Sequence, residues 1–525
     1  MSEPFFQTDC PSCGAPVHAH SATAVTLVCG FCHSLLVRQG AGIIDSGRDS
    51  ALLEDFSPLQ IGTAGTFAAQ PFSIIGRLQA KYEAGLWNEW YVQFADGSNG
   101  WLSEAGDQYV FTLPAAEPLP DTPEFDNLVP GHSNFVYQGK RFWAADVRDI
   151  VLEQAAAEGE LPFELPPQMK NRVADWRCEQ AFLTLDYAES PPEAFIGRGV
   201  NLADLQLSNT RSSAEVAGSA GKLKGTRQAE SCPNCGSPVQ WITGLTPSIL
   251  CPSCGSSLDA AEGKLELLEA NNRRAAQADA FTLKLGAEAT INNRTYTLIG
   301  AVRKDELEPG DAFNLLFGKN PSGITPEGSW TEYLLFEPQA GFMWLVESDG
   351  EWSVSETLNV WPRLQGELFQ PQGLPKLYDY GGRVVLAAGA FYWHIRQGDV
   401  DFYSDYRQNG NGKLCAERNR HEAAWSQSTP VSYRQVREWF GLSGSDVPQY
   451  SADMRADGPS KGLMLLLVAV FVIINLPAWF SMLSSDEDIS LAGTVSVMVL
   501  YFLAKRGDVF SGGGGDDDDD DDDDE

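Results

Sequence analysis

Eight of the ten cysteines in this 525-residue chain fall into four Cys-x-x-Cys pairs. The pairs form two quartets with identical spacing, which are Cys10, Cys13, Cys29 and Cys32, then Cys232, Cys235, Cys251 and Cys254. Four thiolates in a tetrahedron are a preferred ligand set of structural zinc. The spacing therefore predicts two structural Zn²⁺ sites, one in each quartet. Rubredoxin-like iron, and disulfide or redox chemistry, are the alternatives that the spacing leaves open.

The start of the chain bears on the state of these thiols. Residues 1–9 are polar and have neither the basic nor the apolar region of a secretory signal. A protein that stays in a reducing compartment keeps its cysteines as free thiols or metal ligands. Cys178 and Cys415 stand outside the quartets, and we expect both to be buried, inert thiols.

No second motif assembles a recognisable active site. The six histidines, of which His18, His20 and His33 lie in or beside the first quartet, have no partners at a catalytic spacing, and we expect those three on the surface. The sequence contains no P-loop, dinucleotide fingerprint or nucleophile elbow. Several tryptophans could line a ligand pocket, but in β-rich proteins such residues belong more often to the core. We therefore predict no catalytic and no cofactor-binding residues.

Charge argues against nucleic acid as a partner. The formal net charge is −34, and ten acidic residues end the chain, so the remainder still carries a large negative charge. Phosphate contacts need lysine and arginine, yet residues 10–38 contain one basic residue, Arg38, and residues 230–258 contain none.

The elements that must position the cysteines are duplicated. Both quartets match at an offset of 222 residues, and Ile75-Gly76 matches Ile299-Gly300 at an offset of 224. The segment Trp101-Leu102-Ser103-Glu104 matches Trp344-Leu345-Val346-Glu347 at 243. Beyond Trp143 in the first copy, no further match to the second copy is found. A period this long indicates duplication of a pair of domains rather than a solenoid.

Within each copy the pattern is that of β structure. Residues 89–94 and 332–336 are aromatic and β-branched, and each run is followed by turn residues and a second apolar run, as in a hairpin. Helix is expected only at 148–158, 261–275 and 433–440. The predicted fold is mainly β, with two zinc ribbons and two β-rich, barrel- or sandwich-like domains, followed by a C-terminal α-helical transmembrane hairpin. The predicted boundaries are zinc ribbon 1 at 8–38, β-rich domain 1 at 58–207, a linker at 208–230, zinc ribbon 2 at 231–260 and β-rich domain 2 at 281–442.

The last eighty residues change in character. Residues 462–480 and 489–504 contain no charge, and we predict two transmembrane helices there, with a single span as the alternative. Lys461, Lys505 and Arg506 flank the pair, whereas the connecting loop carries only acidic charge. The positive-inside rule then places the N-terminal head and the C-terminal tail in the cytoplasm, at the inner membrane. The Gly and acidic tail, residues 511–525, has no apolar surface to bury and is predicted to be disordered.

These residues resemble a known family. The Ile-Gly and Trp-Leu-x-Glu segments, with Asp405-Tyr406 and Trp425-Ser426, are similar to the bacterial domain-of-unknown-function family 4178, over residues 58–207 and 283–442. The resemblance carries no catalytic residues to this chain. It implies a link to bacterial membrane-associated and stress systems.

Together these patterns predict a membrane-tethered cytoplasmic scaffold or adaptor. The duplicated modules would bind protein partners with increased avidity, and the transmembrane hairpin would anchor the protein in the lipid bilayer. The alternative is an enzyme or a ligand-sensing β domain whose site the sequence does not reveal. A cleft with converging polar groups in a β domain would favour that alternative.

Overall fold

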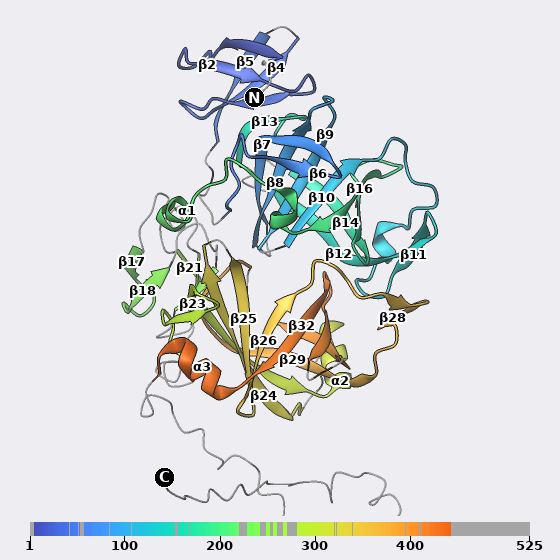
Figure 1. Cartoon of the computed structure of the whole chain (residues 1–525), viewed down its shortest axis with the longest axis vertical. Helices are drawn as coiled ribbons and strands as arrows, with labels where there is room; N and C mark the ends of the chain where they lie inside the picture. Colours follow the sequence, from blue (N-terminus) through green and yellow to red (C-terminus); the bar gives the residue numbers. More distant parts are fainter. Residues whose placement is uncertain are drawn as a thin grey trace, which may run out of the picture. The chain divides into compact units, whose positions relative to one another are not determined.

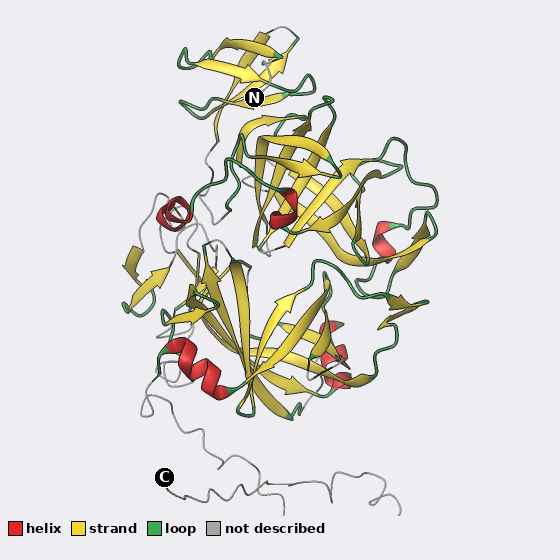
Figure 2. Cartoon of the chain, viewed as in Figure 1, coloured by secondary structure: helices red, strands yellow, loops and turns green. Residues whose placement is uncertain are grey.

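The computed structural model describes residues 5–442, except for residues 41, 51, 53–56, 83–84, 107, 153–155, 167–168, 220–227, 242–247, 252–255, 260–265, 270–280, 320, 322, 339, 394, 409 and 411. The chain divides into two units, residues 1–447 and 448–525, and all described residues lie in the first. These residues are mainly β, as predicted from the sequence (Figures 1 and 2).

The second copy contains a closed barrel of antiparallel strands. Around the barrel the order is β23-β24-β25-β26-β32-β31-β30-β29, and β29 pairs back onto β23. The eight strands are β23 (Arg294–Leu307), β24 (Gly328–Glu337), β25 (Gly341–Ser348), β26 (Glu351–Thr357), β29 (Lys376–Phe391), β30 (Val400–Arg407), β31 (Lys413–Arg418) and β32 (Ala423–Val431). Accessory elements are β22 (Glu288–Ile291), α2 (Pro309–Leu316), β27 (Leu364–Gln365), β28 (Leu368–Pro371) and α3 (Tyr433–Phe440).

The first copy has the same strand order. Neighbouring strands are hydrogen-bonded in the order β7-β8-β9-β10-β16-β15-β14-β12. Strand β13, which follows β12 along the chain, pairs back onto β7. These strands are β7 (Gln70–Tyr82), β8 (Gly85–Phe94), β9 (Asn99–Ala105), β10 (Gln108–Pro114), β12 (Lys140–Leu152), β13 (Ala156–Leu161), β14 (Met169–Cys178), β15 (Ala181–Asp186) and β16 (Glu193–Val200). Beside them lie β6 (Ala64–Phe67), η1 (Phe125–Asn127), β11 (Asn134–Tyr137), η2 (Leu202–Leu205) and α1 (Ser213–Ser219).

Strand register extends the duplication past the point where the sequence match ends. In the second barrel, Asp405 and Tyr406 of β30 pair with Cys415 and Leu414. In the first barrel, Asp175 and Trp176 of β14 pair with Thr184 and Leu183 of β15 in the same way. The two Asp-aromatic pairs therefore occupy equivalent positions.

Each cysteine ribbon is joined to its barrel through the sheet. The first ribbon consists of β1 (Phe6–Asp9), β2 (Pro16–Ala19), β3 (Thr26–Val28), β4 (Ser34–Gln39) and β5 (Gly42–Asp49), and the second of β17 (Gln228–Ser231), β18 (Pro238–Trp241), β19 (Ser248–Leu250), β20 (Ser257–Asp259) and β21 (Glu266–Glu269). Strand β3 pairs with the end of β13, and β19 pairs with the end of β29. The ribbons, expected from the sequence to be separate domains, therefore extend the sheets of the barrels.

Paired glycines mark the seam where each barrel closes. Gly76 lies opposite Gly159, and Gly300 lies opposite Gly389. A Cβ atom on Gly76 would stand 1.8 Å from the carbonyl oxygen of Glu160, and one on Gly389 would stand 2.2 Å from that of Ile299. The register also shifts between Ile74 and Gly76 and between Leu298 and Gly300, as in a β-bulge. The Ile-Gly motif of the sequence is therefore the point at which two backbones approach too closely for a side chain.

The two copies also contact each other. Trp143 and Ala145 of β12 belong to one apolar cluster with Trp361, Phe369 and Trp425 of the second copy. The backbone of Val147 donates a hydrogen bond of 2.9 Å to the carbonyl oxygen of His421. This contact brings β12 beside the turn between β31 and β32.

The helix predictions were partly wrong. Residues 433–440 form α3, as predicted, with Ser432 and Gln435 in a reciprocal capping box. Residues 148–158 are expected to be helical, but their described parts, 148–152 and 156–158, lie in β12 and β13, since pairing with β14 and β7 overrides local propensity. The described part of 261–275 contains β21, and the predicted linker contains α1.

No helix among the described residues is long and apolar enough to cross a membrane. The predicted transmembrane helices at 462–480 and 489–504 and the predicted disordered tail lie outside the described residues.

The seam predicts the effect of a single methyl group. We expect Gly76→Ala to lower stability by about 1–3 kcal/mol, because backbone atoms rather than a flexible side chain must move to admit the Cβ. Gly310→Ala is the matched control, since Gly310 has open space around it and an ordinary φ. Thermal unfolding of the full chain measures both. An unchanged midpoint for Gly76→Ala would contradict the close approach.

Candidate functional site

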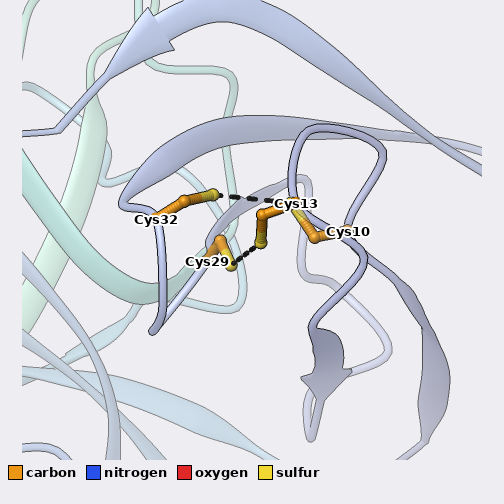
Figure 3. A group of neighbouring side chains, drawn as sticks. All are labelled: Cys10, Cys13, Cys29 and Cys32. Atoms are coloured by element: carbon orange, nitrogen blue, oxygen red, sulfur yellow. Dashed lines mark hydrogen bonds between the residues drawn. The ribbon is translucent and has the colours of Figure 1, made fainter.

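The first cysteine quartet converges on one point. Cys10 and Cys13 follow β1, and Cys29 and Cys32 follow β3, so two hairpins supply two thiols each (Figure 3). Sγ of Cys10 lies 3.7 Å from Sγ of Cys32, and Sγ of Cys13 lies 3.7 Å from Sγ of Cys29. All four sulfurs lie within 4.8 Å of one another.

These separations fit a tetrahedral metal and do not fit disulfides. Four thiolates at about 2.3 Å from one metal ion stand about 3.8 Å apart along the edges of the tetrahedron. A disulfide would bring two sulfurs to about 2.0 Å. The quartet is therefore a group that could hold one metal ion.

The backbone of the turns explains the spacing. The N–H of Gly14 donates to the carbonyl of Cys10, and Gly14 has a φ of 77°, in the left-handed region where glycine is favoured. In the second turn the equivalent bond runs from His33 to Cys29, and His33 itself has a φ of 62°.

The second ribbon repeats the arrangement over its described part. Cys232, Cys235 and Cys251 form a group of three thiols, and Sγ of Cys235 lies 3.7 Å from Sγ of Cys251. Gly236 donates to the carbonyl of Cys232 as Gly14 does to that of Cys10. The fourth predicted ligand, Cys254, lies outside the described residues.

His20 departs from its predicted place on the surface. Its ring Nδ1 lies 3.0 Å from Glu160, and the backbone N–H groups of His20 and Ser21 donate to the same carboxylate. Glu160 is 2% exposed. This carboxylate therefore fixes the first ribbon to β13, whereas His18 and His33 are exposed as expected.

A cavity of about 1200 Å³ lies inside the second barrel. All eight strands contribute to its wall through residues on the inward face, which include Lys304, Glu332, Trp344, Ser355, Tyr380, Tyr403, Glu417 and Ser426. The cavity therefore comprises the barrel lumen together with its mouth, which is also lined by Leu315 and Leu316 of α2 and by Ala105, Gly106, Gln108 and Arg148 of the first copy. An antiparallel barrel of eight strands is wide enough to be filled by side chains or to hold one small ligand.

Acidic side chains outnumber basic ones along this wall. Nine carboxylates line the cavity: Glu306, Glu332, Asp349, Glu351, Asp399, Asp401, Asp405, Glu417 and Glu422. The basic side chains are Arg148, Lys304, Lys413 and Arg420. Arg148 comes from β12 of the first copy, so that copy contributes to the wall.

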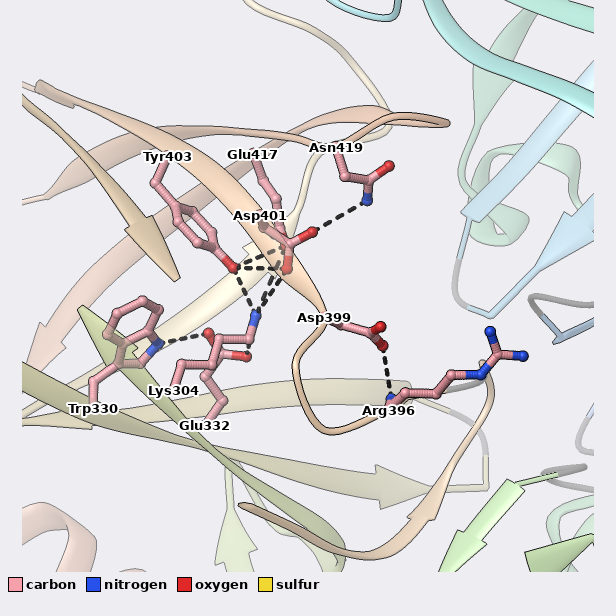
Figure 4. A network of polar contacts seen from close by, with 9 residues as sticks. All are labelled: Lys304, Trp330, Glu332, Arg396, Asp399, Asp401, Tyr403, Glu417 and Asn419. Atoms are coloured by element: carbon pink, nitrogen blue, oxygen red, sulfur yellow. Dashed lines mark hydrogen bonds and ion pairs between the residues drawn. The ribbon is translucent and has the colours of Figure 1, made fainter. Parts of the chain in front are cut away.

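Lys304 is the centre of a charged network in the lumen (Figure 4). Its Nζ donates to the hydroxyl of Tyr403 at 2.6 Å and lies 3.3 Å from Glu332, 3.5 Å from Asp401 and 3.9 Å from Glu417. The Tyr403 hydroxyl in turn lies 3.0 Å from Glu417, and the indole N–H of Trp330 donates to Glu332 at 2.7 Å. Three strands besides β23 thus supply groups to one ammonium.

Exposure divides the network into two parts. The side chain of Lys304 is 7% exposed, whereas that of Glu417 is 39% exposed, because its carboxylate borders the open lumen. Among the described residues, Oε2 of Glu417 has no hydrogen-bond partner. Lys304 therefore holds the network together, and Glu417 is the group that a ligand could reach.

Burial and charge shift the titration of these groups. Burial alone would lower the pKa of Lys304, but Glu332 and the two other carboxylates outweigh it and raise that pKa. Burial raises the pKa of Glu417 to about 8, with Asp401 and Glu332 adding to the rise and Lys304 opposing it.

Aromatic rings stand beside the network. Tyr380 and Tyr403 are stacked with centroids 5.0 Å apart, and Trp330 meets each of them edge-on at 5.7 Å. Gly382 leaves the space for these rings, since a Cβ there would lie 2.6 Å from Trp330. The prediction that the tryptophans are core residues is therefore only partly confirmed. Trp90 is core, as expected, whereas Trp330, Trp344 and Trp393 line the lumen.

The first barrel keeps only part of this set. Trp87 and Glu89 occupy the positions of Trp330 and Glu332, and the indole of Trp87 donates to Glu89 at 3.1 Å. By strand register, Ala80 stands where the second barrel has Lys304, and Val173 stands where it has Tyr403. The Lys304 network therefore belongs to the second copy alone.

No pattern in the sequence predicted this network. Lys304, Glu332, Asp401, Tyr403 and Glu417 come from four strands and share no local motif. One signal was present, since Asp401, Tyr403 and Asp405 alternate along β30 and so point to one face. Cys415, expected to be buried, is half-buried and lines the lumen, where partial burial and Asp405 raise the pKa of its thiol.

Comparison with protein families gives one match. The family described as Domain of unknown function (DUF4178) matches residues 60–202 and again 284–433. Two copies are therefore confirmed, and the first extends past Trp143. No curated protein and no solved structure matches the chain.

Removing the central ammonium should destabilise the barrel in a pH-dependent manner. In Lys304→Met the remaining carboxylates repel one another, and breaking such a group costs about 3–5 kcal/mol when fully buried, less beside an open lumen. Glu417 binds its proton more tightly in the folded state, so the stability that this proton contributes is lost as pH rises through about 8. We therefore expect the loss in Lys304→Met to be larger above pH 8 than near pH 5.

Thermal unfolding of the full chain at the two pH values measures this effect. Lys413→Met is the control, because Lys413 also lines the lumen but is 47% exposed. Equal losses of stability at both pH values would show that Lys304 does not compensate the negative charge of these carboxylates.

Proposed function

We propose that this chain, which belongs to the DUF4178 family, is a ligand-binding protein whose second barrel takes a small organic molecule in its lumen. The observation that supports this is the lumen itself, where a charged network converges on a cavity of about 1200 Å³. That volume is somewhat above the roughly 300–1,000 Å³ of most small-molecule sites.

The network supports binding more than packing. A barrel that served only as a scaffold would gain most from an apolar interior, because replacing buried ion pairs by apolar side chains is often neutral or stabilising. This lumen instead holds Lys304 among three carboxylates and leaves Glu417 accessible. The ligand-sensing alternative is therefore favoured over an adaptor without a site of its own.

Other parts of the functional prediction rest on the sequence. Tethering to the inner membrane by residues 462–480 and 489–504, with both chain ends in the cytoplasm, stays a prediction. So do the protein partners and the link to a stress system. A ligand-binding head on such a tether would report on the cytoplasm at the membrane surface.

We also propose that both cysteine ribbons hold structural Zn²⁺. The first quartet fits this ion through its sulfur separations, and the second through the three described thiols together with Cys254. Bound zinc would supply cross-linking of two hairpins. Four thiolates complete its tetrahedral coordination, so the ion would have no open position for a substrate.

Filling the lumen should abolish ligand binding. Ser426 lines the lumen, and Gln427 beside it on β32 points outward and is exposed. We expect some member of a fragment set with cationic, neutral and anionic compounds to raise the unfolding midpoint in a saturable manner, by roughly 5–10 °C at a hundred times its Kd. Ser426→Trp should abolish that rise, and Gln427→Trp should retain it. If no fragment stabilises the chain in a way that Ser426→Trp abolishes, the proposal is wrong.

Metal content provides a separate test. We expect elemental analysis of the reduced full chain to give about two zinc ions per chain, one for each quartet. Cys13→Ser should lower this to about one and reduce stability, and because β3 pairs with β13, the first barrel should lose stability too. Cys178→Ser, outside both quartets, is the control and should keep both ions. Iron in place of zinc, or no metal in reduced protein, would contradict the assignment.

A further inference from the structure

The lumen of the second barrel already holds ammonium groups that belong to the chain itself. Nζ of Lys304 lies 5.3 Å from the centroid of the Tyr403 ring, and Nζ of Lys413 lies 5.6 Å from that of Tyr378. Each ammonium also has a carboxylate within reach, Glu332 for Lys304 and Asp405 for Lys413. The wall thus solvates primary ammonium groups with an aromatic face on one side and a carboxylate on another.

The wall of the lumen has acidic groups left for an ammonium group besides those of the two lysines. Carboxylates still exceed basic groups along the wall, and Oε2 of Glu417 has no partner among the described residues. Glu417 and Asp401 repel each other, and this repulsion contributes to the raised pKa of Glu417. A further positive charge near Glu417 would relieve that repulsion.

From this geometry we propose that the ligand of the lumen is an organic cation with a primary ammonium head, which binds at Glu417. The proposal rests on the ligand-binding function proposed above and specifies the chemical class of the ligand. The head would donate to Oε2 of Glu417, and its alkyl chain would extend along the lumen past Ser426 and Trp344.

An anionic ligand fits this wall poorly. Lys304 is the basic side chain at the centre of the network, and it is 7% exposed with its donors directed at Tyr403 and three carboxylates. The excess of acidic side chains would repel a carboxylate or phosphate that entered the lumen. To reach Lys304, such an anion would have to displace the carboxylates that already surround this ammonium.

The first barrel provides an internal comparison. Ala80, Asn171 and Val173 stand at the positions of Lys304, Asp401 and Tyr403, so that ammonium, that carboxylate and that aromatic ring are missing there. Asp186 stands at the position of Glu417, but both of its carboxylate oxygens already accept hydrogen bonds, from Asn171 and from the backbone of Ala188. We therefore expect the cation to bind once per chain.

Three probes with similar alkyl chains and cationic, neutral or anionic head groups test the proposal. Butylammonium, butan-1-ol and butyrate have alkyl chains of similar length, and butylammonium matches the side chain of lysine. Saturation-transfer NMR on the full chain measures the binding of each. We expect butylammonium to bind about ten- to a hundredfold more tightly than butan-1-ol, as one charge-assisted hydrogen bond implies, with butyrate weakest.

Variants locate the bound head. The binding is measured at pH 9, where Glu417 is ionised because the pH lies above its raised pKa of about 8. There Glu417→Gln keeps the shape of the side chain and removes its charge, and it should weaken butylammonium binding about tenfold or more while leaving butan-1-ol unchanged. Glu356→Gln, on the outward face of β26, is the control and should change neither. Ser426→Trp should abolish binding of all three probes.

The outcomes separate this proposal from the one on which it rests. If butan-1-ol binds as tightly as butylammonium and Ser426→Trp abolishes both, ligand binding stands and the cationic class is wrong. If butylammonium binds equally to Glu417→Gln, the placement of the head at Glu417 is wrong. If butylammonium does not bind while another fragment occupies the lumen, the cationic class is wrong. If no compound of either set depends on the lumen, both proposals fail.

Discussion

Closure of the second barrel at one glycine seam is the constraint on which the rest of the site depends. Strand β29 returns to β23 with Gly389 opposite Gly300, where a side chain would collide with backbone. A sheet that closes on itself removes its own edges and encloses a lumen. Without this contact the inward faces of the eight strands would not meet, and the groups around Lys304 would be distributed along an open sheet.

The same closing strand positions the ribbon. Beyond the seam, β29 continues and pairs with β19, just as β13 pairs with β3 in the first copy. A metal bound by the cysteines would thus stabilise a hairpin that continues the barrel sheet, and it would lie apart from the lumen network. In the first copy the buried carboxylate of Glu160 also accepts hydrogen bonds from the ribbon. By strand register Ala390 occupies the equivalent position in the second copy, so this polar contact is missing there. Ribbon and barrel are best regarded as one folding unit in each copy.

The two copies show how one framework can hold different interiors. Seam glycines, strand order and the Trp-x-Glu pair recur in both, and these are the features that build the barrel. Lys304 and Tyr403 occur only in the second, where they organise the charged network. A buried ammonium among carboxylates is costly to desolvate, so its presence calls for a role beyond stability, and an accessible Glu417 at its edge is consistent with recognition of a ligand.

Fixed spacing, turn residues and alternation are local properties of a chain, and they were enough to predict the repeated modules, the β class and the two cysteine quartets. The sequence also located the Ile-Gly motif, though not its purpose. That residues 148–152 and 156–158 are strand depends instead on tertiary pairing, since their partner strands β14 and β7 are distant in the sequence. The lumen site was likewise beyond the sequence. Lys304, Glu332, Tyr403 and Glu417 lie on four strands, and only barrel closure and strand register bring their side chains to one point.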